Sequence, residues 1–359
     1  MNIPLGIISD PRHIFYFTGF STYKSRINSL LLVDCLKGEH ELVVGTSEEG
    51  AARGAFAGRV ETYPDYDLGN GMVVYPDTFS RLVRDQLRDR IIGERGRVGI
   101  EEWHLPVIYL SALKSTRTGV SEIILSMRRK KGRDELAFHQ EATKLLDRAY
   151  RDARAYSRPG RSEVQLFRRV NSSYFEREGA TDSWPYSNVH GDFLAGRRSL
   201  EIGGPPTENR MMRGDTLIMD MQASCNHYWA DTARTFVVGS APTARQERIL
   251  EVLLRAKRGA EEALRPGTRG SEIYDIASGV IVDAGFSPLP HHAGHGVGLD
   301  TQEAPFFIPG SADTIEEGDV CALEPGIYDK DAGGMRIEDN YLITKDGFKK
   351  TSRFPLTLG

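Results

Sequence analysis

The segment Asp220-Met-Gln-Ala-Ser-Cys-Asn-His-Tyr-Trp-Ala-Asp231 places two carboxylates eleven residues apart, and it is the most informative stretch of this chain. Three further residues whose side chains can bind metals follow it, in the order His295, Glu324 and Glu338. Four carboxylates and one imidazole suit two adjacent divalent cations that share bridging carboxylates and activate a water molecule. We therefore predict a hydrolase with a dinuclear metal centre.

The sequence around two of these acids favours burial over a solvated position. Thr216-Leu-Ile-Met-Asp220 and Val320-Cys-Ala-Leu-Glu324 both read as apolar strands that end on a charge. An isolated Asp or Glu is usually solvated, but an ionised carboxylate at the end of a buried strand costs free energy unless it is paired or metal-bound. Two such acids, together with a glycine-flanked His295, make chance a weak explanation.

The order and spacing of these residues resemble those of the pita-bread metallopeptidases, which include methionine aminopeptidase, prolidase and aminopeptidase P. The matching motifs are Asp220, Asp231-Thr-Ala-Arg234-Thr235, the stretch from His291 to Gly298, Glu324-Pro-Gly and Arg336-Ile-Glu338-Asp339. They cover roughly residues 128–359. A weaker match, His13-Ile-Phe-Tyr-Phe-Thr-Gly-Phe20, is similar to a signature of the Xaa-Pro peptidase branch.

The resemblance implies an α/β (α+β) fold in two domains. Residues 1–126 are expected to form a small amino-terminal α/β domain of the creatinase and prolidase type. Residues 127–359 are expected to form a pita-bread catalytic domain whose two ααβ halves are related by a pseudo-two-fold axis. Local patterns in the first domain alternate strand and helix candidates: strands at 5–8, 29–33, 41–44 and 98–101, and helices at 47–55, 78–92 and 106–114.

A repeated helix boundary supports the two halves. A long helix over 134–157 ends at Arg158-Pro-Gly, and the next is expected to start at a Ser162 N-cap with Glu163 in its first turn. Arg265-Pro-Gly precedes Ser271 and Glu272 in the same way, which indicates an internal duplication unless chance punctuation explains it. Between the domains, the basic cluster Arg128-Arg-Lys-Lys131 in segment 127–133 reads as a solvated linker.

The resemblance also implies roles for the candidate ligands. Asp231 and Glu338 bridge two divalent ions, Asp220 is a terminal ligand of one ion, and His295 and Glu324 bind the other. The ions can be Mn, Co, Fe or Zn, because oxygen-rich ligation does not select among them. Glu324 is also the candidate proton shuttle between the water and the leaving amine.

Four further residues lie close to the expected ligands in the matching motifs. Arg336 is expected to orient the carboxylates without binding a metal itself. Arg234 either does the same near Asp231 or is a surface arginine. His291 polarises the substrate carbonyl, whereas His292 is expected to be a bystander.

Three departures from the family pattern fall on the substrate side. Gln302 stands seven residues after His295, where the family has a second substrate-binding His. The segment 199–207 lacks an expected Pro-His pair, and Gln222 replaces the usual Gly two residues after Asp220. With all five ligands kept, this pattern predicts intact hydrolysis with an altered or narrowed specificity.

These features leave three classes of function open. The favoured class is an Xaa-Pro exopeptidase, an aminopeptidase P or prolidase-like homodimer that cleaves short peptides before proline. The alternative is a hydrolase of non-peptide C–N bonds, of the ectoine-hydrolase or creatinase type, on the same fold. A metal-free peptide-binding scaffold is disfavoured by the five intact ligands.

Composition excludes several partners. The formal charge of −4 is small, and the single short basic cluster does not favour nucleic acid. No run approaches the roughly 20 apolar residues of a membrane span, so no membrane partner is expected. The three cysteines are far apart, and we expect Cys35 and Cys321 to be free buried thiols. Together with a start that lacks a signal-peptide pattern, they indicate a cytoplasmic location.

Overall fold

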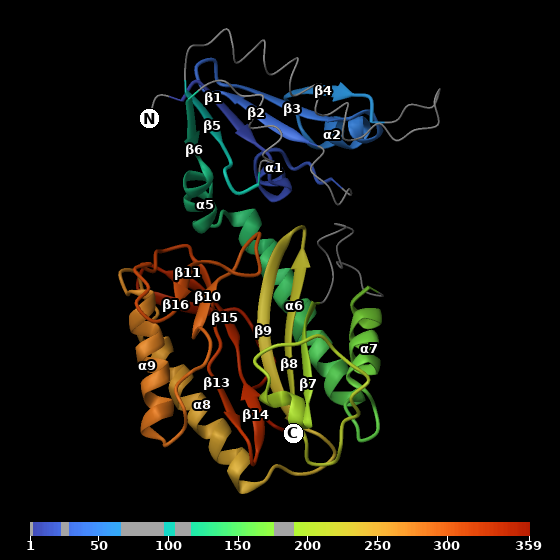
Figure 1. The fold of residues 1–359 in the computed structure, drawn as a ribbon, viewed down its shortest axis with the longest axis vertical. Helices are drawn as coiled ribbons and strands as arrows, with labels where there is room; N and C mark the ends of the chain where they lie inside the picture. Colours follow the sequence, from blue (N-terminus) through green and yellow to red (C-terminus); the bar gives the residue numbers. More distant parts are fainter. Residues whose placement is uncertain (1–2, 23–28, 66–96, 105–115, 176–189) are drawn as a thin grey trace. The chain divides into compact units, whose positions relative to one another are not determined.

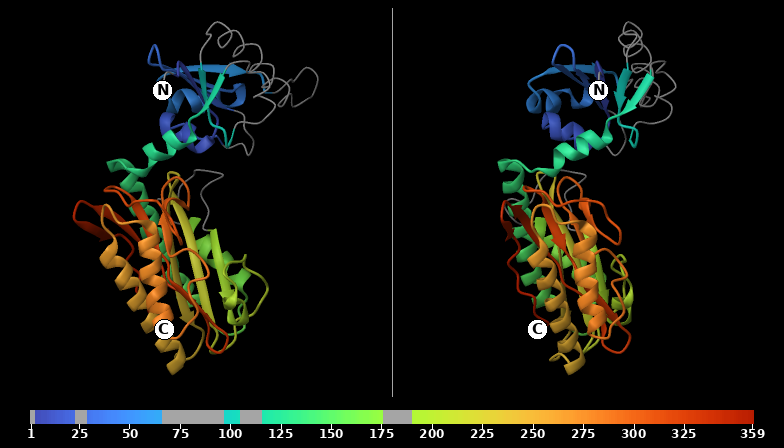
Figure 2. Two further views of the ribbon diagram at one scale, coloured as in Figure 1. Left: turned by 60° about the vertical axis from the view of Figure 1, so that its left-hand side comes forward. Right: turned by 90° about the vertical axis from the view of Figure 1, so that its left-hand side faces the viewer.

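The computed structural model describes residues 3–22, 29–65, 97–104, 116–175 and 190–359. These residues belong to two compact units, Met1–Met127 and Arg128–Gly359. Each unit combines helices with strands (Figure 1, Figure 2). The helices expected at 78–92 and 106–114 lie outside the described residues.

The amino-terminal unit contains β1 (Leu5–Ile8), α1 (Pro11–Thr18), β2 (Leu30–Asp34), β3 (Glu39–Gly45), η1 (Thr46–Glu48), α2 (Glu49–Ala55), β4 (Arg59–Tyr63), β5 (Arg97–Ile100), β6 (Thr116–Gly119) and α5 (Ser121–Arg129). The strands form one mixed sheet in the order β4-β3-β2-β1-β5-β6. Apolar side chains of its strands pack with those of α1, α2 and α5 in one core. The four expected strands are confirmed, and the expected helix at 47–55 is α2, preceded by the turn η1.

The stretch that resembles the Xaa-Pro peptidase signature forms α1 and its carboxyl end. Asp10 caps the helix, because its Oδ1 accepts a hydrogen bond from the Arg12 backbone N–H at 2.8 Å, and Pro11 follows at the first helical position. Gly19 ends the helix with φ of 73°, a left-handed conformation that glycine adopts without strain. Asp10-Pro11 and Gly19 therefore mark the two ends of α1, a helix that the sequence analysis did not predict.

The carboxy-terminal unit repeats the order helix, helix, strands. Its first half contains α6 (Arg133–Tyr156), α7 (Glu163–Phe175), β7 (His190–Ala195), η2 (Gly196–Leu200), β8 (Thr216–Cys225) and β9 (Tyr228–Val237). Its second half contains α8 (Ala244–Ala263), α9 (Gly270–Asp283), β10 (Gly294–Gly296), β11 (Glu303–Phe307), β12 (Val320–Leu323), β13 (Gly326–Asp329), β14 (Gly333–Arg336), β15 (Asp339–Thr344) and β16 (Gly347–Lys350). The described sheets have the orders β7-β8-β9, β11-β10-β12-β15-β16 and β13-β14, and their strand pairs are antiparallel.

Each half buries its own apolar core between its helices and its strands. Side chains of α6 and α7 pack against β7, β8 and β9, whereas those of α8 and α9 pack against the strands of the second half. Figure 1 shows the two helix pairs flanking the strands on opposite sides. This arrangement confirms the expected mixed α/β class and the pita-bread architecture, and it excludes a doubly wound parallel sheet.

The two expected serine caps have different outcomes. Ser162 caps α7, because its Oγ accepts from the Gln165 N–H at 3.3 Å while the Gln165 side chain accepts from the Ser162 N–H at 3.0 Å. Ser271 is not a cap, since α9 begins one residue earlier, at Gly270. A Cβ atom on Gly270 would lie 2.2 Å from the Phe306 carbonyl oxygen. Close packing against β11 therefore requires a glycine at the first residue of α9.

The expectation of a solvated linker at 127–133 is wrong. α5 extends to Arg129, and the side chains of Arg128 and Lys131 are buried. Glu303 lies 2.6 Å from an Arg128 guanidinium nitrogen and 2.5 Å from the Lys131 ammonium, and Arg128 is also 2.6 Å from Asp300. Arg128 and Lys131 of the basic cluster are buried because carboxylates more than 170 residues later in the chain neutralise them, whereas Lys130 is exposed.

The three cysteines are all free thiols. Cys225 and Cys321 are buried, but Cys35 is exposed, contrary to expectation, because β2 ends at Asp34 and Cys35 begins the turn after it. Among the described helices, none combines the length and apolar composition that crossing a membrane requires.

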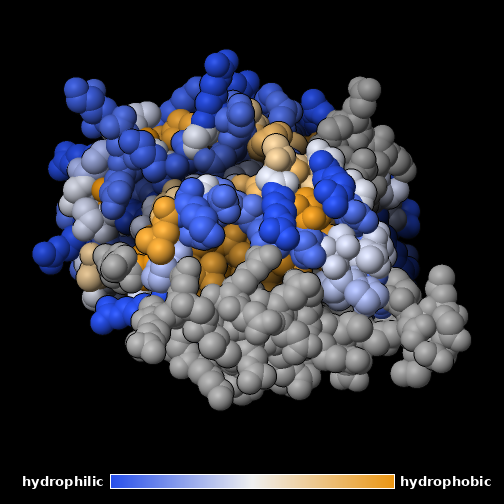
Figure 3. Space-filling model, turned by 90° about the horizontal axis from the view of Figure 1, so that it is seen from above, coloured by the Kyte–Doolittle hydropathy of each residue, from blue (hydrophilic) through white to orange (hydrophobic). Residues whose placement is uncertain are grey.

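The surface of the amino-terminal unit has a hollow of about 780 Å³, lined by charged residues such as Lys37 and Glu39 together with Leu5 and Leu32. Figure 3 views the molecule from above relative to Figure 1. Most of the coloured surface in that view is hydrophilic, with some apolar side chains between the charged ones. None of the residues that line this hollow belongs to a group of described side chains that could hold a metal ion. The candidate chemistry lies in the carboxy-terminal unit.

Candidate metal centre

A β-hairpin brings Asp220 and Asp231 together. β8 and β9 are joined by Asn226 and His227, whose φ angles of 44° and 69° are those of a tight two-residue hairpin turn. The turn sets the register so that Asp231 lies opposite Gln222, and Asp220 faces the same side two residues away. The eleven-residue spacing is therefore the signature of a hairpin. Asp220 lies in the middle of β8, so the expectation that the strand ends at this acid is wrong.

The second half contributes three residues from neighbouring strands. His295 is in β10, which pairs with β12, and Glu324 directly follows β12 as expected. Glu338 precedes β15, and its N–H donates to the carbonyl of Ala233 in the first half at 3.0 Å. Potential ligand atoms of Asp231, His295 and Glu338 lie within 4.8 Å of one another. The two halves thus meet at one cluster.

The cluster contains buried polar atoms that lack a partner. The Nδ1 atom of His295 lies 2.9 Å from the Gly296 carbonyl oxygen, which makes Nδ1 the protonated nitrogen and leaves a lone pair on Nε2. That Nε2 atom and both carboxylate oxygens of Glu338 have no hydrogen-bond partner among the described residues, although Glu338 is only 1% exposed. Unpaired acceptors that converge in a buried site fit a bound cation.

The ionisation of the acids supports the same conclusion. Burial, followed by repulsion from Glu324, raises the pKa of Asp220 to about 6 even though Arg336 opposes the shift. Burial and neighbouring carboxylates raise the pKa of Asp231 and of Glu338 well above their usual values. A divalent cation would relieve this repulsion, so the donor set fits hard to borderline divalent ions.

Glu324 behaves in the opposite way. Burial opposes its ionisation, but the neighbouring imidazoles of His292 and His295 outweigh burial and lower the pKa of Glu324. The Nε2 atom of His292 lies 2.6 Å from Glu324 Oε1, and His292, His295 and Glu324 form a second group that could hold a metal. The expectation that His292 is a bystander is therefore wrong. Of the adjacent pair His291 and His292, the sequence alone did not indicate which ring reaches the acid.

Arg336 forms ion pairs with two acids. Its Nε atom lies 2.9 Å from Asp220 Oδ2, and an Nη atom lies 2.6 Å from Asp192 Oδ2. Asp192 lies in β7 directly opposite Asp220, and sequence analysis missed it. The run Phe193-Leu-Ala after it is apolar, whereas apolar runs precede Asp220 and Glu324, and no family motif marks the position of Asp192. Arg336 thus neutralises two neighbouring carboxylates from one side.

Tyr328 connects His291 to Arg336. Its hydroxyl lies 2.9 Å from His291 Nε2 and accepts from an Arg336 Nη atom at 3.3 Å. The other ring nitrogen of His291 lies 2.7 Å from the His292 carbonyl, and burial lowers the pKa of His291. A hollow of about 640 Å³, lined by Ile202, Tyr328 and other residues, lies beside these groups. Tyr328 lies four residues after Glu324, and the sequence analysis gave it no role.

Two other expected residues lie outside the groups of potential ligand atoms. Gln302 is exposed, and it precedes Glu303, whose strand pairs with Gly296 beside His295. Arg234 is fully buried, so it is not a surface arginine. It donates to the main-chain carbonyl of Glu338 and forms an ion pair of 2.8 Å with Asp339.

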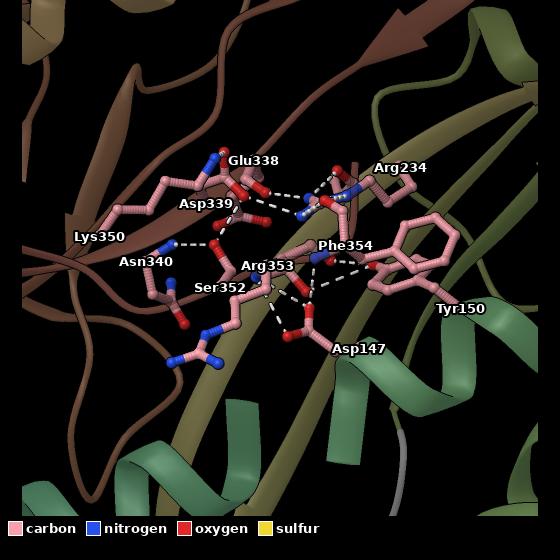
Figure 4. A network of polar contacts seen from close by, with 12 residues as sticks. Asp147, Tyr150, Arg234, Glu338, Asp339, Asn340, Lys350, Ser352, Arg353 and Phe354 are labelled. Atoms are coloured by element: carbon pink, nitrogen blue, oxygen red, sulfur yellow. Dashed lines mark hydrogen bonds and ion pairs between the residues drawn. The ribbon is translucent and has the colours of Figure 1, made fainter. Parts of the chain in front are cut away.

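Asp339 forms ion pairs with several cationic side chains next to the site. Lys257 lies 2.8 Å from its carboxylate, and Lys350 forms a further ion pair with it. Figure 4 shows Arg234 and Lys350 converging on Asp339 beside Glu338. These cations outweigh burial and lower the pKa of Asp339. The network holds the backbone that carries Glu338.

Comparisons with known proteins agree with this geometry. Residues 137–345 match the model of metallopeptidase family M24, and residues 2–129 match the creatinase/prolidase amino-terminal domain. The chain is 32% identical over 262 residues to an Xaa-Pro dipeptidase of Pyrococcus horikoshii. The aligned residues cover 71% of this chain and 73% of that protein. The prolidase structures from Pyrococcus horikoshii and Pyrococcus furiosus superpose with TM-scores of 0.85 and 0.82, each at 27% identity. They cover 99% and 98% of this chain and 96% of each prolidase chain.

Proposed function

Because this chain belongs to metallopeptidase family M24, we propose that it is an Xaa-Pro exopeptidase that cleaves the bond before proline in short peptides. The observation that carries this proposal is the buried Glu338 carboxylate. Its two oxygens have no hydrogen-bond partner in the described part of the chain, and one of them lies within 4.8 Å of potential ligand atoms of Asp231 and His295. The named activity of the Pyrococcus dipeptidase supports the choice of substrate.

The proposed cation site uses the five residues Asp220, Asp231, His295, Glu324 and Glu338. They would hold two divalent ions, with Mn, Co, Fe and Zn all compatible with the donor set. Two such ions lower the pKa of a bound water and stabilise the charge that develops on the scissile carbonyl oxygen.

The remaining roles fall to side chains around the acids. Glu324 has a lowered pKa, so it is ionised at neutral pH and can accept the proton of the attacking water and pass it to the leaving nitrogen. Arg336 keeps Asp220 ionised and oriented. His291 is the candidate contact to the substrate carbonyl, and it is held in place by Tyr328. Gln302 is exposed, which leaves its amide accessible to a bound peptide.

Two further features belong to the same proposal. A reducing cytoplasmic location is supported by the three free cysteines. A homodimeric assembly is supported by the family resemblance alone, and light scattering on the purified chain tests it.

A substrate panel tests the proposed function. The full chain is stripped of metal, reconstituted with Mn, Co or Zn, and assayed on Xaa-Pro dipeptides, Xaa-Pro-Yaa tripeptides, Met-Ala-Ser and ectoine. The proposal expects turnover of the proline peptides and about two ions per chain by elemental analysis. Hydrolysis of ectoine without hydrolysis of any peptide would move the chain to the non-peptide class.

A further inference from the structure

Gln222 lies between two of the candidate ligands. It is opposite Asp231 in the β8–β9 pairing, and Asp220 points to the same face because it is two residues away on the same strand. The Nε2 atom of Gln222 donates to Asp220 Oδ1 at 3.0 Å and to Asp231 Oδ1 at 2.9 Å. One side-chain amide therefore spans both carboxylates.

The chemistry of an amide suits this position. Asp220 and Asp231 are two buried carboxylates, and both accept a hydrogen bond from the same amide nitrogen. A glutamine NH₂ group has two donors and no charge, so it can bind both acids without competing with a cation. Each Oδ1 atom keeps a second lone pair, so the two amide hydrogen bonds remain compatible with a bound ion.

A lysine or an arginine at the same place would neutralise the acids and weaken cation binding. A glycine would leave their separation to be set by the ion alone. A glutamine between two strand-borne acids instead fixes their spacing before any ion arrives.

We propose that Gln222 is a positioning residue of the cation site, whose amide holds Asp220 and Asp231 at the spacing that a shared divalent ion needs. This inference rests on the proposed cation site. Groups that hold metal ligands through hydrogen bonds typically contribute ten- to hundredfold to metal affinity. Loss of the amide therefore weakens binding of the ion that these two acids share by about ten- to hundredfold.

The test uses the metal-free full chain and no substrate. Wild type, Gln222→Met and Gln222→Gly are titrated with Co²⁺ and Mn²⁺ by calorimetry, and the Co²⁺ absorption band reports the ligand geometry. Met keeps the length of the side chain but removes both donors, whereas Gly removes the side chain. Gln140→Met, on the exposed face of α6, is the matched control.

Both Gln222 variants are expected to bind the shared ion ten- to hundredfold more weakly and to alter the Co²⁺ band, with Gln140→Met unchanged. Wild-type affinity in Gln222→Met overturns the inference, because the residue would then only fill space, whether or not Gln222→Gly is weakened. A wild-type chain that binds no ion overturns the proposed cation site itself, so the two failures are distinguishable.

Discussion

The buried ion cluster that joins the end of α5 and the residues after it to β11 makes a quantitative prediction. Replacing Glu303 by Gln removes the carboxylate that lies 2.5 Å from Lys131 and 2.6 Å from Arg128. Arg128 keeps Asp300 as a partner, so the stranded charge is the ammonium of Lys131, whose side chain is only 2% exposed. Breaking a buried pair by removing one partner costs about 3–5 kcal/mol. We expect about 3 kcal/mol for Glu303→Gln, because Gln can still accept one hydrogen bond.

Calorimetry of the full chain at pH 7 measures this loss. For a unit of this size, about 3 kcal/mol corresponds to an unfolding midpoint roughly 6–12 °C lower. Adding Lys131→Met to Glu303→Gln should recover part of the loss, because the second change removes the stranded ammonium. Burial opposes ionisation of Glu303, but the cations outweigh it and lower its pKa. The contribution of the ionised Glu303 to stability is therefore fully present at a pH above its pKa in the unfolded chain, about 4.3. It is lost as the pH falls through the lower pKa of the folded state.

An exposed ion pair provides the control. Glu141 and Lys144 are 2.5 Å apart on α6, but their side chains are 53% and 55% exposed. Glu141→Gln should change stability by less than about 1 kcal/mol. The reasoning fails if Glu303→Gln is as mild as Glu141→Gln, or if adding Lys131→Met makes the single variant still less stable.

Three further predictions concern the metal, pH and specificity. Asp231→Ala should bind fewer ions than the two expected in wild type by elemental analysis, and unchanged occupancy would remove Asp231 from the site. Burial lowers the pKa of His139 to about 4, whereas the unfolded chain takes up this proton near 6.5. Urea unfolding should therefore show that the free energy of unfolding of the wild type falls by about 3 kcal/mol between pH 6.5 and 4 because of His139. His139→Gln should lack that part of the loss, and equal pH slopes would contradict the argument. Gln302→His should raise kcat/KM for Xaa-Pro dipeptides by about tenfold if it adds one charged hydrogen bond, and an unchanged value would exclude a substrate contact at this position.

Much of the site could be predicted from the chain because its signals are local. The apolar runs before Asp220 and Glu324 predicted buried strands, and both strands form. The spacing of Asp220 and Asp231 reflects a two-residue turn, which depends only on the residues between them. The Pro-Gly boundaries after the long helices act in the same way, because glycine and proline alter the backbone where they stand.

The missed residues are those whose environment comes from elsewhere in the fold. Asp192 gains importance only because β7 pairs with β8 and places it opposite Asp220. His292, and not His291, contacts Glu324, because the direction of each ring depends on how the loop before β10 packs. Neither fact has a signature in the neighbouring sequence.

The sequence by itself determined the candidate metal ligands, which are four acids and one histidine, and the order in which they occur along the strands. Tertiary structure alone decided which charges are buried and with whom. Arg128 and Lys131 have the composition of a solvated linker, yet they are buried because Glu303 and Asp300 arrive from a strand and loop more than 170 residues later. A charge leaves water only when an opposite charge compensates its desolvation, and only the folded chain brings that partner within reach.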